Sequence, residues 1–154
     1  MKSDVRCIVF KRKKILLVKR EDNGLWELPG GGIEENESYL KAAKRELKEE
    51  TGLESRNQRV IGFWVNRLLF INKQSTLIRI AGIGSLVPSF ESPEVKYWAI
   101  KDFIKLPKHI RKLIKHIESG SRKTCYMSLR DYEIIVIIKY IYGKIKRYLR
   151  KFKT

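Results

Sequence analysis

The chain has 154 residues, of which 43% are apolar, so it can bury the core of one domain and is not a disordered polypeptide. Its net charge is +17, yet residues 21–54 carry ten acidic and only four basic side chains. An acidic segment within a basic protein suggests a cation site that faces a polyanionic substrate. The general excess of lysine has a second explanation, because a hot habitat or a biased genome also produces it.

Two cysteines, Cys7 and Cys125, lack the spacing of a metal site or of a disulfide framework. A reducing compartment is therefore expected, and we predict a cytoplasmic protein. The first residues do not resemble a signal peptide. The longest apolar run, residues 134–138, is too short to cross a bilayer, so no transmembrane segment is expected.

Two strands are predicted near the start of the chain, over residues 4–10 and 14–20, from their alternating and short buried apolar runs. A basic hairpin turn separates them, and residues 21–24 are expected to form a loop. A short extended segment at 25–28 is then stopped by Pro29 and three glycines.

The strongest helical pattern spans residues 38–51. Leu40, Ala43 and Leu47 recur at intervals of three and four residues and predict one buried face. Gly52 is the expected residue after the helix, because glycine adopts a left-handed backbone at little cost.

The centre of the chain reads as strands joined by short loops. Strands are predicted at 57–65, 67–71, 76–83 and 95–100. Residues 72–73 are interpreted as a turn. Residues 86–94, which contain two prolines, are interpreted as a loop.

Two helices are predicted to close the chain. The first begins at Pro107, a favoured first helical residue. Its apolar face comprises Ile110, Leu113, Ile114 and Ile117. The second spans about 129–150, with Ser128 and Asp131 resembling a capping box, although residues 134–138 would also suit a strand. Its apolar stripe, which we expect to contact the core, comprises Ile134, Ile138, Ile141, Ile145 and Leu149. We predict a domain over residues 1–123 and a basic helical extension over 124–154, packed on or beside it.

Three glutamates crowd one face of the helix predicted at 38–51. At about 100° per residue, Glu49 and Glu50 lie on either side of Glu46. A solvated acidic face is the ordinary explanation, but like charges at this spacing destabilise a helix. Three glycines precede the helix, where backbone can approach a ligand closely. Because hard divalent cations prefer carboxylate oxygens, the segment predicts a magnesium site.

The spacing of these residues resembles the Nudix box of a hydrolase family. The matching positions are, in order, Gly31, Glu37, Arg45, Glu46, Leu47, Glu49, Glu50, Gly52 and Leu53. Pro29, Gly30 and Trp26, which precede the box, also resemble the family. Nine positions at fixed spacing are far more specific than a lone glycine loop. The resemblance implies an α/β fold in which a mixed sheet is sandwiched between helices.

The resemblance also implies a role for each matched residue. Glu46, Glu49 and Glu50 would bind Mg²⁺, with Mn²⁺ as a substitute, and the backbone carbonyl of Gly30 would assist. One of these carboxylates is an alternative general base. Arg45 would orient the carboxylates, because a guanidinium fork can hold a carboxylate in one geometry.

Many family members use a further acid from a later loop. The candidates here are Glu91 and Glu94, of which Glu91 is preferred, and a solvated loop is the alternative. Trp64 and Phe63 lie on a predicted strand and could stack on a base, although strand aromatics more often belong to a core. His109 and His116 are expected on the surface of a basic helix.

The resulting functional prediction is a magnesium-dependent pyrophosphohydrolase. Its substrate would be a nucleoside diphosphate-linked small molecule, such as a nucleotide, a damaged nucleoside triphosphate or a nucleotide sugar. The alternative is an enzyme that trims or decaps RNA 5′ ends. A non-catalytic nucleotide- or nucleic-acid-binding module is a third hypothesis, which the intact motif disfavours.

The basic end of the chain leaves its partner open. Residues 144–153 mix cations with aromatic side chains and could bind RNA phosphates or lie on an acidic membrane surface. A solvated helix face above a core contact would explain them equally. Many members of the family form homodimers, and the sequence does not decide this point.

Overall fold

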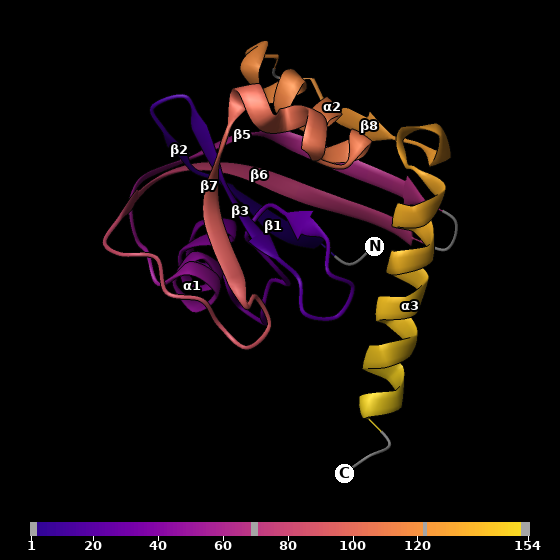
Figure 1. Ribbon diagram of the computed structural model, residues 1–154. Coiled ribbons are helices and arrows are strands. Elements are labelled where there is room, and N and C mark those ends of the chain that lie inside the picture. Colours follow the sequence, from indigo (N-terminus) through magenta and orange to yellow (C-terminus); the bar gives the residue numbers. More distant parts are fainter. Residues whose placement is uncertain (1–2, 69–70, 122, 152–154) are drawn as a thin grey trace.

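The computed structural model describes residues 3–68, 71–121 and 123–151. Two four-stranded sheets lie at the centre of the molecule, with helices around them (Figure 1). The strands are β1 Ser3–Ile8, β2 Phe10–Lys11, β3 Lys14–Lys19, β4 Trp26–Glu27, β5 Glu54–Leu68, β6 Ile71–Ile83, β7 Glu94–Ala99 and β8 Cys125–Met127. The helices are α1 Tyr39–Thr51, α2 Lys108–Glu118 and α3 Ile134–Arg150, with short 3-10 helices η1 Ile100–Lys105 and η2 Leu129–Asp131.

One sheet is mixed and the other is antiparallel. The first has the order β1-β6-β5-β8, in which β1 runs parallel to β6 and β8 runs parallel to β5. Strands β5 and β6 form a long antiparallel pair. In the second sheet, β3 pairs with β2, β4 and β7, always antiparallel. The predicted α/β fold with a mixed sheet is therefore confirmed.

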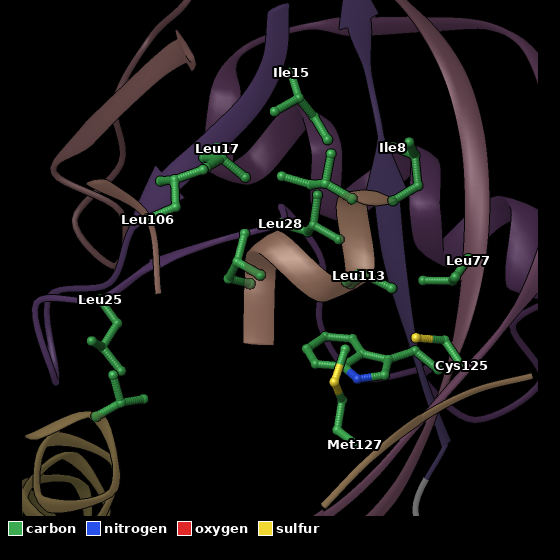
Figure 2. Close-up of a cluster of buried hydrophobic side chains, with 14 of the residues drawn as sticks. Ile8, Ile15, Leu17, Leu25, Leu28, Leu77, Leu106, Leu113, Cys125 and Met127 are labelled. Atoms are coloured by element: carbon green, nitrogen blue, oxygen red, sulfur yellow. The ribbon is translucent and has the colours of Figure 1, made fainter. Parts of the chain in front are cut away.

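Hydrophobic cores cover both faces of the mixed sheet. Successive residues of β1 point to opposite faces, so that Cys7 joins the cluster beneath α1 while Ile8 joins the cluster beneath α2. Figure 2 shows the second cluster, in which Leu113 of α2 lies among side chains of β1, β6 and β8. The mixed sheet is thus held between helices, as the resemblance implied.

Helix α1 begins and ends where its sequence signals predict. The Ser38 hydroxyl accepts a hydrogen bond from the backbone N–H of Lys41, which caps the first turn. Gly52 adopts a left-handed backbone with φ of 75° and donates its N–H to the Lys48 carbonyl. Leu47 is fully buried, but Leu40 is 41% exposed, so the predicted place of Leu40 on the buried face was wrong.

The central strands differ from the prediction in number. Residues 72–73 do not form a turn, because both lie within β6 and pair with residues 67 and 66 of β5. Two long strands therefore replace the three that were predicted. Sheet pairing along the whole of β6 overrides the turn preference of Asn72. Residues 69–70, at the end of the predicted strand 67–71, lie outside the described residues.

The last segment also departs from the prediction. Residues 125–127 form β8 beside β5, and α3 begins at Ile134 instead of residue 129. Ser128 and Asp131 do interact, since the Asp131 carboxylate accepts a hydrogen bond from the Ser128 N–H at 2.9 Å. This bond spans the short helix η2 and does not cap α3. No helix within the described ranges is long and apolar enough to cross a membrane.

The apolar stripe of α3 lies on the surface. Its five residues, predicted to contact the core, are each between 47% and 78% exposed. His109 was predicted on the surface and is instead fully buried, stacked on Tyr132 with ring centroids 4.4 Å apart. Burial lowers the pKa of His109 to about 4. Both errors have one cause, because α2 and α3 pack through faces that mix polar and apolar side chains.

Candidate active site

A cavity of about 1350 Å³, called here the central cavity, opens beside the N-terminal end of the glycine-rich loop. Its wall combines carboxylates from α1, cations from several elements and Trp64, which also belongs to the hydrophobic core. The cations are Arg6, Arg20, Lys73, Lys144 and Arg147. A cavity with this composition suits a ligand that carries phosphates and an aromatic base.

Strand β1 fixes the glycine-rich loop of residues 30–32. The backbone N–H of Val5 donates to the Gly31 carbonyl at 3.0 Å, and that of Cys7 donates to the Pro29 carbonyl at 2.7 Å. Gly30 has a φ of 144°, and an added Cβ would lie 2.1 Å from the Val5 carbonyl oxygen. Only glycine therefore allows the loop to lie this close to the strand.

The loop also lies directly against α1. A Cβ added to Gly31 would lie 2.5 Å from Oε1 of Glu46. Because Gly31 has no side chain, the Glu46 carboxylate can occupy this space. Burial raises the pKa of Glu46, while its hydrogen bond from Arg45 opposes the shift.

Arg45 binds the acidic residues around it through all three guanidinium nitrogens. Its Nε and Nη2 donate to the two oxygens of Glu37 at 3.1 and 2.9 Å. Its Nη1 donates to Glu46 at 2.8 Å and to Glu49 at 3.2 Å. Nη2 also donates to the Gly32 carbonyl at 2.9 Å, which ties α1 to the loop. The bond to Arg45 lowers the pKa of Glu37.

Glu50 is one of the buried carboxylates of the cavity wall. The backbone N–H of Gly30 donates to its Oε2 at 2.8 Å, and Nη1 of Arg20 donates to its Oε1 at 3.2 Å. Ser92 donates to the same Oε1 at 3.4 Å. Burial nevertheless raises the pKa of Glu50, and the nearby charge of Glu46 adds to the rise. Glu46 and Glu50 therefore face one cavity, and their hydrogen bonds offset only part of the cost of burying their charges.

The three predicted metal ligands do not converge. Glu46 and Glu50 line the central cavity, whereas the side chain of Glu49 is 58% exposed and turns to Arg45. Across residues 3–68, 71–121 and 123–151, no cluster of three or more His, Cys, Asp and Glu side chains is arranged to hold a metal ion. The structure thus brings together two of the three carboxylates, with Gly30 beside them.

The other predicted residues separate into two groups. Glu91 and Trp64 line the central cavity. Glu94 instead pairs with Lys19 at 2.6 Å and lies outside the lining. Phe63 is 38% exposed and also lies outside it, because neighbouring residues of a strand point to opposite faces. The indole N–H of Trp64 is buried and has no hydrogen-bond partner.

Sequence analysis missed the cationic side of the cavity. Arg6 pairs with Asp4 at 3.1 Å and approaches Glu27 at 3.7 Å. These carboxylates keep the pKa of Arg6 raised, although burial alone would lower it. Arg6 and Asp4 are two residues apart on β1, so strand alternation could have placed both on one face.

Helix α3 supplies two further cations. Lys144 and Arg147 line the cavity together with Tyr140, whose hydroxyl donates to Glu27 at 2.7 Å. Residues 140, 144 and 147 recur at intervals of four and three. A polar row opposite the apolar stripe was therefore readable in the sequence.

An acidic loop fixes α3 to the domain. Lys146 and Arg150 donate to Glu21 at 2.5 and 2.9 Å, and Arg147 lies 3.0 Å from Asp22. The bonds from Arg150 and then Lys146 lower the pKa of Glu21 to about 2. Helix α3 is thus held by its polar face and forms one wall of the cavity.

Comparisons with known proteins indicate a family and a fold. The family model described as "NUDIX domain" matches residues 2–116. The chain is 47% identical over 55 residues to an RNA pyrophosphohydrolase of Hydrogenovibrio crunogenus, a match that covers 36% of this chain and 33% of that protein. The matching segments span only 29% to 39% of the length of the curated relatives compared.

Solved structures are similar over most of the chain. A MutT protein from Bacillus halodurans matches with a TM-score of 0.70 and 22% identity, over 86% of this chain and 94% of that one. An ADP-ribose pyrophosphatase from Streptococcus suis matches with a TM-score of 0.61 and 29% identity, over 82% and 98% of the two chains. The first match supports the fold alone.

Proposed function

The chain belongs to the Nudix family, and from this premise we propose that it is a Mg²⁺-dependent pyrophosphohydrolase of nucleoside diphosphate-linked molecules. One observation carries the proposal. Two carboxylates of α1, the half-buried Glu46 and the buried Glu50, lie against a glycine loop and face a cavity whose lining also contains five cations. A diphosphate bridged to a divalent cation has the complementary charge distribution.

The residues of the site fit a divalent cation. Burial raises the pKa of both Glu46 and Glu50, so a cation placed between them would favour their charged forms. Magnesium is commonly held by one or two carboxylates and by substrate phosphates, which matches a site with two converging carboxylates. We propose Glu46, Glu50 and the Gly30 carbonyl as its ligands, with Glu49 joining if it leaves Arg45. Mn²⁺ would be able to replace Mg²⁺ at this site.

A bound cation would neutralise phosphoryl oxygens and make water a better nucleophile. The protein itself would position the groups. Arg45 holds the Glu46 carboxylate in one orientation, and Arg20 and the Gly30 N–H do the same for Glu50. Arg6, Lys144 and Arg147 would bind the phosphates of the substrate. Fixed charges of this kind need no rearrangement as negative charge develops on the leaving group.

Hydrolysis requires a base that takes the proton of the attacking water. We propose Glu91 for this role, because its side chain lines the cavity and belongs to a loop that the Glu21 N–H anchors at 2.9 Å. The water oxygen bonds to one phosphorus as the bond from that phosphorus to the bridging oxygen breaks. The departing phosphate carries the electron pair away.

Trp64 is the proposed stacking partner of the base. Trp64 lines the cavity at the edge of the hydrophobic core, where it is 5% exposed, and its buried N–H has no partner within the protein. Phe63 lies outside the lining and is the weaker candidate. Stacking is worth about 1–3 kcal/mol per base and tolerates different bases, so it would anchor the nucleoside without selecting it.

RNA 5′ ends are the second candidate substrate. The relative from Hydrogenovibrio crunogenus is named an RNA pyrophosphohydrolase, and α3 brings two cations into the cavity wall. A longer nucleic acid could follow such a basic surface out of the site. A cytoplasmic location and a homodimer both stay predictions.

A screen for hydrolysis tests the proposal. The full chain is incubated with Mg²⁺ and separately with nucleoside triphosphates, nucleotide sugars, ADP-ribose and 5′-triphosphorylated RNA, and products are identified by chromatography. We expect cleavage of a diphosphate bond that excess EDTA abolishes. Full turnover in EDTA would contradict the metal site. Binding without turnover on every substrate would favour a non-catalytic module.

A further inference from the structure

The exposed stripe of α3 is an apolar feature that the proposed function leaves unused. Ile134, Ile138, Ile141, Ile145 and Leu149 follow one side of the helix and are 78%, 54%, 47%, 52% and 54% exposed. Ile135 and Tyr142 beside them are also exposed. Contiguous apolar patches of this kind are rare on monomeric proteins and mark interaction sites.

The helix cannot turn this stripe inward. Its opposite side is fixed by the hydrogen bond from Tyr140 to Glu27 and by the ion pairs of Lys146 and Arg150 with Glu21. Gly143 lies against the loop at Asn23, where an added Cβ would approach at 3.0 Å. In Figure 1, α3 lies at the edge of the molecule, with one side open to solvent. The stripe therefore faces away from the domain.

Positive charges border the stripe on both sides. At about 100° per residue, Lys139 lies at one border, and Lys144 and Lys151 lie at the other. All three are exposed. The sequence of α3 contains five basic residues and no acidic residue, in a protein of net charge +17. An apolar sector flanked by lysines on both borders is typical of helices that lie in a membrane interface.

The charge pattern selects the partner. A second copy of the chain would place like-charged borders side by side and would bring two strongly positive bodies together. Nucleic acid would match the charge but would leave aliphatic isoleucines without a partner. An anionic lipid bilayer offers acyl chains to the isoleucines and headgroups to the lysines.

We propose that α3 docks this protein on the surface of an anionic lipid bilayer. The stripe enters the boundary between headgroups and acyl chains, and Lys139 and Lys151 contact acidic headgroups. Because the other side of α3 forms a wall of the central cavity, docking holds that cavity beside the bilayer. The inference does not depend on the proposed hydrolysis.

Sedimentation with vesicles tests the proposal. The full chain is mixed with vesicles of phosphatidylglycerol or of phosphatidylcholine, at low salt and at high salt. We expect binding to phosphatidylglycerol that weakens with salt yet persists, because apolar insertion is not screened. Binding to phosphatidylcholine should be at least about tenfold weaker, since that surface offers no net charge to the basic helix.

Two sets of variants separate insertion from general charge attraction. The double variant Ile138→Ser, Ile145→Ser should lower the partition coefficient about tenfold or more, since it removes buried methylene groups. Ile104→Ser is the matched control, because Ile104 is 75% exposed on η1 and lies outside the stripe. The change Lys139→Glu, Lys151→Glu should weaken binding to phosphatidylglycerol by roughly fivefold for each lysine.

Unchanged melting temperatures would show that these variants are folded. Three results would overturn the proposal. The first is a double variant that binds phosphatidylglycerol as well as the original chain does. The second is equal binding to both lipids. The third is a stable dimer, seen by light scattering, that the double variant dissociates, because it would assign the stripe to a second copy.

Discussion

Helices α1 and α3 face the same cavity but have opposite construction. Helix α1 buries small and apolar side chains, Ala43 and Leu47 among them, and presents carboxylates to the cavity. Helix α3 presents cations to the cavity and leaves its apolar stripe in solvent. The difference shows that an apolar helix face packs on the core only where polar tertiary contacts do not orient the helix otherwise.

The two helices also differ in capping, since a side chain caps the first turn of α1 but not that of α3. Ser38 and Gly52 define both ends of α1 by hydrogen bonds of their own. Helix α3 has no side-chain cap at Glu133. Its position depends on ion pairs to Glu21 and Asp22, which are contacts between distant parts of the sequence. Local signals therefore specify α1, and tertiary contacts specify α3.

The largest contrast concerns catalysis. On the proposed mechanism, Glu50→Gln should lower kcat/KM more than the roughly 10–100-fold typical of residues that only support metal ligands. Ile145→Ser on α3 should leave hydrolysis nearly unchanged. Steady-state kinetics in saturating Mg²⁺ measure both. Glu118→Gln, an exposed carboxylate at the end of α2, is the matched control.

Stability should separate Glu50→Gln from an unfolding mutation. Burial raises the pKa of Glu50, so the ionised carboxylate opposes folding wherever the unfolded chain would carry this charge. The neutral variant should melt no lower than the original chain in the absence of metal. Near-normal activity of the folded variant would move the metal site away from this residue.

The second contrast concerns packing. Leu47 is fully buried in α1, whereas Ile145 of α3 is 52% exposed. Leu47→Ala should lower the free energy of unfolding by roughly 2–5 kcal/mol, and Ile145→Ala by less than about 0.5 kcal/mol. Denaturation in urea measures both values. Equal losses would show that the stripe of α3 is covered in solution.

These contrasts explain how far the sequence predicts the molecule. The Nudix box places the loop, α1 and the carboxylates, because cap, glycines and spacing are all local signals. It does not place Glu49 toward Arg45, since that orientation depends on which carboxylate each guanidinium nitrogen binds. The roles of Arg6, Lys144 and Arg147 required the tertiary fold, which brings distant elements to one cavity.

His109 shows the same limit for burial. Its neighbours on a basic helix predict a surface residue, yet its ring stacks on Tyr132 and its Nε2 lies 3.5 Å from the Tyr140 hydroxyl. Strand β8 and helix η2 place Tyr132 over α2, and no local sequence pattern predicts these two elements. Hydropathy alone cannot assign a histidine whose burial depends on aromatic neighbours.

The third contrast concerns pH, because this buried histidine lies where α2 meets α3. The pKa of His109 is about 4 in the folded protein, below its ordinary value of 6.5. Between pH 4 and 6.5, His109 is therefore protonated in the unfolded chain but neutral in the folded chain. The contribution of His109 to stability should be constant above pH 6.5 and fall by roughly 3 kcal/mol as pH falls toward 4.

Urea denaturation at several pH values measures this loss. His109→Gln should remove most of the slope between pH 6.5 and 4, whatever it does to stability at pH 7. His116→Gln lies on the same helix, where its Nε2 contacts the Lys123 carbonyl at the surface, and should leave the slope unchanged. A slope that survives in His109→Gln would place the titration elsewhere.

The smallest contrast compares two glycines in close contact. Gly30 has a positive φ, and an added Cβ would meet the backbone of β1 at 2.1 Å, so Gly30→Ala should be strongly destabilising. Gly143 lies inside α3, and its added Cβ would meet Cβ of Asn23 at 3.0 Å. Strand β1 is fixed between β6 and the loop, whereas α3 has open space on its exposed side.

A shift of a few tenths of an ångström would relieve the contact at Gly143. Alanine favours a helix over glycine by about 0.8–1.0 kcal/mol, so Gly143→Ala should raise the free energy of unfolding by up to about that amount. Urea denaturation measures the change, with Gly84→Ala, which is exposed and meets no atom within 4 Å, as a test of backbone strain alone. A loss above about 1 kcal/mol for Gly143→Ala would mean that α3 resists displacement as firmly as β1 does, because overpacking costs about 1–3 kcal/mol only where the surroundings cannot yield.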